Sequence, residues 1–171
     1  MGHYAIQLAK IKGAQQVIAT VSGPEKADVA REAGADILIN YKTTDISSAV
    51  REATLGEGVD RIVEVDLAAN IDTDISILRP DGEVIAYGSG AGEIPVPFSP
   101  AIRKGVHIYF FIVYNMSSEI RERAIADLSM LLEGNQLSHN IAARLPLARI
   151  AEAHELVEQG RVIGNVVIEI D

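Results

Sequence analysis

Residues 1–30 read MGHYAIQLAKIKGAQQVIATVSGPEKADVA, and this stretch decides the fold. Apolar residues within 4–11 fit a helix packed on one side, and Gly13 is a natural C-terminal stop. Residues 16–21 are strand-like, and Ser-Gly-Pro at 22–24 is typical of a helix start, because proline suits the first helical turn. The stretch therefore predicts a helix, a strand and a second helix, the middle of a nucleotide-binding βαβ unit.

The first strand of that unit is expected to be missing or borrowed from a partner. A crossover helix normally links two parallel strands, yet only Met1 precedes the first predicted helix.

The rest of the chain alternates between short apolar runs and amphipathic segments with glycine-containing joints. This alternation predicts an α/β fold, a Rossmann-type doubly wound, mostly parallel sheet lacking its first strand, within one domain over 1–171. Strands are expected at 36–40, 61–65, 84–87, 107–113 and 164–170. Helices are expected at 24–33, 46–53, 68–78, 118–132 and 148–159. The sequence also predicts a turn at 80–82, an irregular connector at 94–100 and an extended segment at 139–145.

Charge and composition exclude several kinds of partner. The chain has 24 acidic and 15 basic residues, and a net charge of -9 disfavours nucleic acid and anionic membranes. It has no cysteine, so it offers no disulfide and no thiolate metal ligand. No charged-then-apolar leader and no membrane-length apolar run is visible, which predicts a cytoplasmic protein.

Ligands of a doubly wound sheet bind at the carboxyl ends of its strands. The strand at 16–21 is followed by Ser22, Gly23 and, one helical turn on, Lys26. A hydroxyl, a backbone N–H, a helix N-terminus and a lysine form an anion cradle, at a place where NAD-binding units usually carry an acid. This predicts NADPH rather than NADH. The alternative is that Ser22 only caps the helix and Lys26 is a solvated charge.

Glycines mark two further points at which a ligand could approach the backbone. Gly2 lies where the first helix would approach a pyrophosphate, and Gly88-Ser89-Gly90 could let a flat ring lie against a strand end. A glycine-rich exit from a strand is also compatible with a simple turn.

No catalytic constellation and no metal site is predicted within this chain. No histidine has a partner at metal-ligand spacing, and His107 and His154 are interpreted as polar edge positions. Glu64 and Asp66 share one face of a strand, but no substrate pocket suggests an acid–base role for them.

Several segments, in this order and spacing, resemble the medium-chain dehydrogenase/reductase superfamily of zinc-binding dehydrogenase-like proteins, with the quinone oxidoreductase branch the most similar. The resemblance covers essentially the whole chain. Its segments are 2–10 (GHYAIQLAK), 17–22 (VIATVS) with Glu25-Lys26, 34–41 (GADILINY), 58–60 (GVD), 78–82 (LRPDG), 87–90 (YGSG) and 164–167 (GNVV).

The resemblance implies a two-domain enzyme that passes hydride from NADPH to quinones or other conjugated carbonyls. Its GroES-like catalytic domain has no counterpart here, so the chain alone is expected to be inactive. Residues from about 139 to 171 would pack on that domain. Gly2 corresponds to the last glycine of the family fingerprint, and Met1 to a position often held by valine, which raises the hypothesis of a misread start codon.

The resemblance also implies roles for individual residues. Ser22, Gly23, Lys26 and Tyr41 would bind the adenosine 2'-phosphate, while Gly88, Ser89, Gly90, Phe111 and Val113 would lie beside the nicotinamide. The chain departs from the branch at Ala68, where glycine is common, and at Asn165, where a lysine often helps with the phosphate.

The family further implies a homodimer in which strand 107–113 pairs with its twin across a two-fold axis. The apolar, aromatic composition of this strand fits that pairing, although burial inside a single sheet explains the same residues. A second hypothesis for the function is accordingly a non-catalytic module that oligomerises or binds through a sheet edge.

Overall fold

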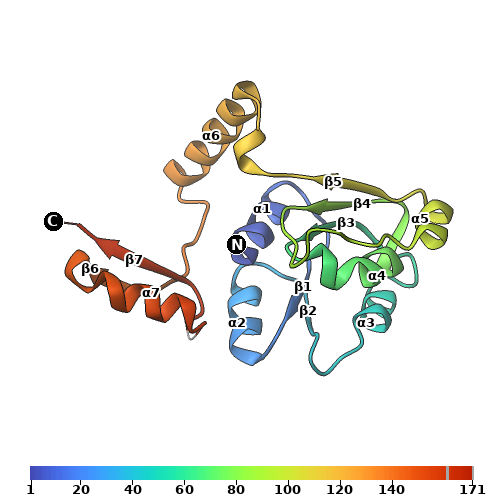
Figure 1. Ribbon diagram of the computed structural model, residues 1–171, viewed down its shortest axis with the longest axis horizontal. Coiled ribbons are helices and arrows are strands. Elements are labelled where there is room, and N and C mark those ends of the chain that lie inside the picture. The colour runs from blue at the N-terminus through green and yellow to red at the C-terminus, as the bar shows by residue number, and fades with distance from the viewer. Residues whose placement is uncertain (161, 171) are drawn as a thin grey trace. The chain divides into compact units, whose positions relative to one another are not determined.

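The computed structural model describes residues 1–160 and 162–170 of the chain (Figure 1). The chain forms two compact units. The first consists of Met1–Asn40 together with Met130–Asp171, and the second consists of Tyr41–Ser129.

The first unit begins with the predicted helix–strand–helix–strand succession. It comprises α1 (Gly2–Ile11), β1 (Ile18–Val21), α2 (Pro24–Glu32) and β2 (Ile37–Asn40), and β1 pairs with β2 in parallel. Gly23 is the N-cap of α2 and Pro24 its first residue, as proline's fixed φ favours. The small core of this region is formed by Ile6, Val21, Ala30, Ala33 and Ala35.

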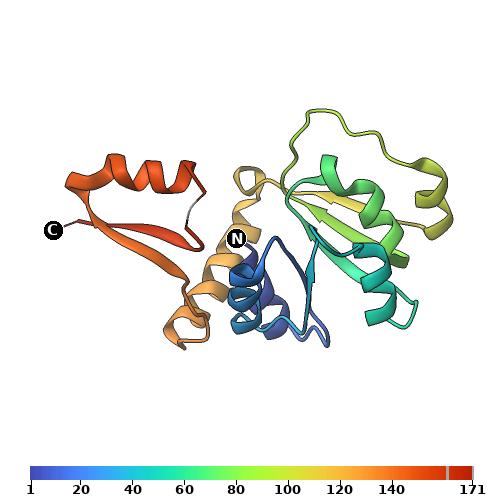
Figure 2. The same ribbon diagram turned by 90° about the horizontal axis from the view of Figure 1, so that it is seen from below.

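The C-terminal part of the first unit is a second parallel pair. It consists of β6 (Ile141–Pro146), the short 3-10 helix η2 (Leu147–Arg149), α7 (Ile150–Glu158) and β7 (Asn165–Glu169), with α7 packed against both strands (Figure 2). Its connection to α1 is polar: Gln7 exchanges hydrogen bonds with Ser138, and the Tyr4 hydroxyl bonds His139 Nδ1 at 2.9 Å.

The second unit is built on the parallel sheet β3–β4–β5. Its elements are α3 (Ile46–Ala53), β3 (Val59–Glu64), α4 (Leu67–Ile77), β4 (Leu78–Ala86), α5 (Phe98–Lys104), β5 (His107–Phe110) and η1 (Val113–Asn115), and α6 (Ser118–Glu133) contains the boundary with the first unit. α4 packs on the sheet, and together they bury Leu67, Ile71, Ile75, Leu78, Val84 and Ala86.

The parallel α/β architecture predicted from the sequence is confirmed, but not as one continuous sheet. The described strands form three separate parallel groups, β1–β2, β3–β4–β5 and β6–β7. The expected turn at 80–82 lies inside β4 as an irregularity: Val59 faces Leu78, whereas Arg61 already faces Glu83. Asp81 takes the left-handed backbone there, with φ 57°.

Two further expectations in the second unit were wrong. Residues 98–104, assigned to a connector and its continuation, form α5, because Pro100 falls in the first helical turn, where no backbone N–H is lost from the ladder. The strand expected at 107–113 ends at Phe110, and burial does not explain its apolar composition. Tyr109 and Phe110 are 49% and 76% exposed.

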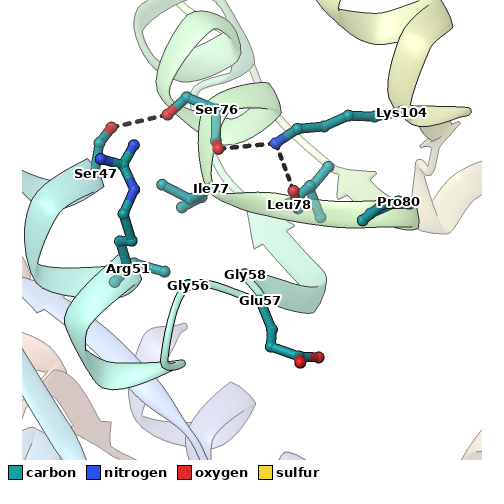
Figure 3. Close-up of a pocket in the computed structure, with 11 residues that line it drawn as sticks. Ser47, Arg51, Gly56, Glu57, Gly58, Ser76, Ile77, Leu78, Pro80 and Lys104 are labelled. Carbon is teal, nitrogen blue, oxygen red and sulfur yellow. Dashed lines mark hydrogen bonds between the residues drawn. The ribbon is translucent and has the colours of Figure 1, made fainter.

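Lys104 caps the C-terminal end of α4 in the second unit (Figure 3). Lys104 Nζ, from the last turn of α5, donates to the carbonyl oxygens of Ile75, Ser76 and Leu78 at 2.6–2.8 Å. These bonds satisfy carbonyls that a helix end leaves without partners. Burial lowers the pKa of Lys104, and the positive charge of Arg51 lowers it further.

The cavity beside Lys104 has a volume of about 150 Å³. Its wall includes Gly58 and Leu78, at the amino ends of β3 and β4, so it lies at the opposite end of these strands from the predicted ligand edge.

Candidate functional site

The carboxyl end of β1 carries the predicted anion cradle. Ser22 and Gly23 follow β1 directly, and Lys26 lies in the first turn of α2. Gly23 occupies the N-cap, and no side chain caps the helix. The part of the alternative in which Ser22 caps the helix is therefore wrong, whereas the part in which Lys26 is a solvated charge stays open. Within residues 1–160 and 162–170, no acidic side chain pairs with Lys26, which is exposed.

The chain's own packing does not explain why position 23 is glycine. Its φ of 170° is extended backbone that any residue adopts, and a Cβ there would meet no heavy atom of the chain within 4 Å. The same open space surrounds Gly2 at the start of α1. Both positions leave their backbone accessible.

Two other predicted residues lie elsewhere. Tyr41 directly follows β2 and is about half exposed. Asn165 begins β7, where its backbone N–H and its side-chain amide both donate to the Asn140 carbonyl, at 2.8 and 3.3 Å. The amide of Asn165 thus has a partner inside the β6–β7 pair.

In the second unit, three hydrogen bonds join the carboxyl ends of β3 and β4. Tyr87 N–H donates to the Glu64 carbonyl at 3.0 Å, and Leu67 N–H donates to the Gly88 carbonyl at 3.2 Å. Gly90 N–H donates to the Asp66 carboxylate at 2.8 Å. The segment 87–90 is therefore fastened to the end of the neighbouring strand.

The chain's own packing does require glycine at position 88. A Cβ on Gly88 would overlap the Val65 carbonyl oxygen, and one on Gly90 would lie 3.3 Å from both Asp66 carboxylate oxygens. Gly88 permits a close approach of two backbone segments, and Gly90 leaves room for the Asp66 side chain.

A mainly apolar hollow of about 380 Å³ lies beside this segment at the ends of β4 and β5. It brings together three predicted residues, Gly88, Ser89 and Phe111. Gly90 and Val113 are not part of its wall. The lining residues are Leu67, Ala86, Tyr87, Gly88, Ser89, Ile94, Phe110, Phe111, Ile112 and Asn115.

Two acids of the second unit are buried, Glu64 in β3 and Asp74 in α4. Glu64 is 7% exposed, and its Oε1 accepts hydrogen bonds from Asp66 N–H at 2.5 Å and Asn70 Nδ2 at 3.1 Å. Asp74 is 4% exposed, and its Oδ2 has no protein partner. Burial raises the pKa of Asp74 to about 7, and the charge of Glu64 contributes to the increase. Burial and the charge of Glu64 also raise the pKa of Tyr87.

Comparison with known proteins identifies the family. Residues 1–129 match the family described as zinc-binding dehydrogenase. The chain belongs to the zinc-binding dehydrogenase family. The resemblance to medium-chain dehydrogenases/reductases found in the sequence is thereby confirmed, and quinone oxidoreductases are among the relatives.

The chain spans about half the length of the curated relatives it matches. A 2-haloacrylate reductase of Burkholderia sp. is 34% identical over 98% of this chain and 52% of its own. A quinone oxidoreductase of Pseudomonas aeruginosa is 29% identical over 98% and 53%. The solved structure of a mycobacterial protein in complex with NADPH has a TM-score of 0.82 and 26% identity, over 98% of this chain and 53% of that one.

The name of the zinc-binding dehydrogenase family implies a metal, and the described residues of this member do not fit one. They contain no group of three His, Cys, Asp or Glu side chains that could hold a metal ion. Among the same residues, no helix is long and apolar enough to cross a membrane.

Sequence reasoning did not assign a role to two residues of the candidate site, Asp66 and Tyr87. Asp66 and Tyr87 lie next to strand ends that the sequence had located, but their contacts join segments more than 20 residues apart. The position of Asp66 directly after a strand was the available signal. Nothing in the sequence indicated its bond to Gly90.

Proposed function

We propose that this chain is the cofactor-binding part of an NADPH-dependent oxidoreductase that transfers hydride to a quinone or another conjugated carbonyl. The observation that carries the proposal is the cradle of Ser22, Gly23 and Lys26 after β1, with no acid in residues 21–23, directly at the strand end, although Glu25 lies in the first turn of α2. Family membership and a relative solved with NADPH support the choice of cofactor class. The names of two relatives, a 2-haloacrylate reductase and a quinone oxidoreductase, support a conjugated acceptor.

The first unit would hold the adenosine end of the cofactor. The Ser22 hydroxyl, Gly23 N–H and Lys26 ammonium would bind the 2'-phosphate, assisted by the positive N-terminal end of α2. The family pattern assigns the same role to Tyr41, the first residue of the second unit. Gly2 would let the start of α1 approach the pyrophosphate. Asn165 stands where the quinone oxidoreductase branch commonly has a lysine for the phosphate, and its amide can offer only a weaker, uncharged hydrogen bond.

The second unit would hold the nicotinamide end. Gly88, Ser89 and Phe111 line a hollow whose apolar walls would exclude water from the transferring hydride. We place Gly90 and Val113 beside the same ring by their similarity to the family pattern. When bound, the nicotinamide supplies the hydride, and this chain's residues position and shield it.

Residues from about 139 to 171 would pack on a further domain of the whole enzyme. The strands β6 and β7 form a separate pair, and Leu147, Ile150 and Val157 around α7 are 41–61% exposed. Several exposed apolar side chains around one helix favour a partner surface that covers them.

Titration of the purified chain with NADPH and NADH, followed by nicotinamide fluorescence, tests the proposed function. We expect NADPH to bind about tenfold or more tightly than NADH, because only NADPH carries the 2'-phosphate. Equal affinities would remove the argument for NADPH. Binding of neither dinucleotide at millimolar concentration would overturn the proposal.

A second candidate function is assembly through β5, as a homodimer. Among the described residues, β5 pairs only with β4, and the stretch that follows it exposes Ile112, Val113 and Tyr114 by 52–81%. An unpaired apolar edge of this kind favours pairing with a second copy.

Light scattering across a concentration series tests this assembly. We expect a mass of twice 18.4 kDa for the wild type and a shift to monomer for Tyr109→Asp, which places a charge in the edge strand. Leu55→Asp, at an exposed apolar residue outside β5 and outside the stretch that follows it, is the matched control. A wild type that stays monomeric would contradict the dimer.

A further inference from the structure

Asp66, directly before α4, has an unusual hydrogen-bond partner for its position. Asp66 is the N-cap of α4, a position at which an aspartate normally accepts a hydrogen bond from the first turn of its own helix. Its carboxylate caps nothing in α4. Instead, it accepts the Gly90 N–H at 2.8 Å, from a segment 24 residues further along the chain.

The backbone of Asp66 is itself held by a buried acid. Glu64 Oε1 accepts the Asp66 N–H and also the Asn70 side-chain amide, which belongs to the first two turns of α4. The position of the Asp66 carboxylate is therefore fixed from both sides, by the end of β3 and by α4.

The segment that Asp66 holds has few other anchors. Gly88 is fastened through its carbonyl to Leu67 N–H, and Ser89 bonds only within its own turn, to Ala91. Beyond Gly90, residues 91–97 form no helix or strand, and Figure 2 shows them as a long connector leading to α5. Along the described chain, the bond to Asp66 is thus the last hydrogen bond that joins this segment to the end of β3.

We propose that Asp66 is a positioning residue for the nicotinamide end of the cofactor, acting by holding Gly90 and so placing Ser89 and Gly88 along the hollow. This inference rests on the proposed function. Asp66 does not line the hollow itself. Without its carboxylate, only the bonds of Tyr87 and Gly88 would join the segment to the end of β3, and residues 89–90, of which Ser89 lines the hollow, would lose their fixed position.

The test compares ligands that share only one end. NADPH carries both the 2'-phosphate and the nicotinamide, whereas adenosine 2',5'-bisphosphate lacks the nicotinamide. We expect Asp66→Ala to weaken NADPH about tenfold and to change adenosine 2',5'-bisphosphate binding less than about twofold, measured by calorimetry. Asp66→Asn keeps an acceptor oxygen and should restore most of the NADPH affinity. Asp72→Ala, an exposed aspartate on the same helix, is the control.

A second measurement needs no ligand. Hydrogen exchange of the Gly90 amide should be at least about tenfold faster in Asp66→Ala than in the wild type or Asp72→Ala, because its acceptor is lost. Unchanged exchange at Gly90 would overturn the anchoring role.

The outcomes separate the inference from the function on which it rests. Equal loss of both ligands in Asp66→Ala, or loss of neither, would overturn the positioning role while leaving the NADPH proposal intact. A wild-type chain that binds neither ligand would overturn the proposed function, and Gly90 exchange would still decide whether Asp66 holds the segment.

Discussion

Gly23 and Gly88 each come just after a parallel strand, in the first and the second unit respectively, yet their surroundings are opposite. A Cβ on Gly23 would meet nothing, whereas one on Gly88 would overlap the Val65 carbonyl. The polar groups near Gly23 are accessible, while those near Gly88 are bonded to one another. The difference separates a glycine that the surrounding atoms do not require from one that the packing of the fold does require.

The largest effect should come from exchanging glycine for alanine at these two positions. Gly88→Ala should lower the free energy of unfolding by about 3 kcal/mol, because β3 and β4 must move apart to admit the methyl group. Gly23→Ala should lower it by less than about 1 kcal/mol, since alanine is a poorer N-cap than glycine but the surroundings are open. Urea denaturation measures both. A comparable loss of stability in the two variants would contradict the difference between the surroundings of Gly23 and Gly88.

The buried Asp74 makes the stability of the folded chain depend on pH. Its pKa in the folded chain is about 7, raised by burial and then by Glu64, against 3.8 for the ordinary carboxyl. The folded state therefore holds the proton between about pH 4 and pH 7, and stability falls as the pH rises through this window.

Asp74→Asn should remove this loss of stability. At pH 8 the variant should be more stable than the wild type by about 2 kcal/mol. This is roughly half of the free energy that corresponds to a pKa difference of about three, because water and side chains relax around the charged carboxylate. At pH 4 the two should be equal. Thermal unfolding at both pH values decides the matter, and a difference that does not change with pH would contradict the assignment of the proton to Asp74.

The smallest expected effect is the change in NADPH affinity when Lys26, in the first turn of α2, is replaced. Lys26→Ala should weaken NADPH by about 1.4 kcal/mol, a factor of ten, and leave NADH unchanged, because only the 2'-phosphate faces the lysine. Arg31→Ala, on the same helix and paired with Asp28 on the surface, is the matched control. If both variants reduced the two affinities alike, the site would not be a specific phosphate cradle.

The elements near the proposed phosphate site were predictable because their signals are local. A proline at the first position of α2 and a left-handed Gly34 after its end act within a few residues. α5 was missed because Pro97 and Pro100 also read as a connector, and only the structure shows that Pro100 lies in a first turn. The short length and exposure of β5 could not be read from its aromatic sequence, which burial explained equally well.

The sequence by itself determined the α/β alternation, the helix start at residues 22–24, the basic and hydroxyl groups beside it, and the lack of an acid in residues 21–23. These features depend on periodicity, capping and residue type over short spans. Only the tertiary structure decided that the strands form three groups, that Asp66 holds Gly90, and that Asp74 is buried near Glu64. Such contacts join residues distant in the chain, and packing of whole elements against one another, not local preference, brings them together.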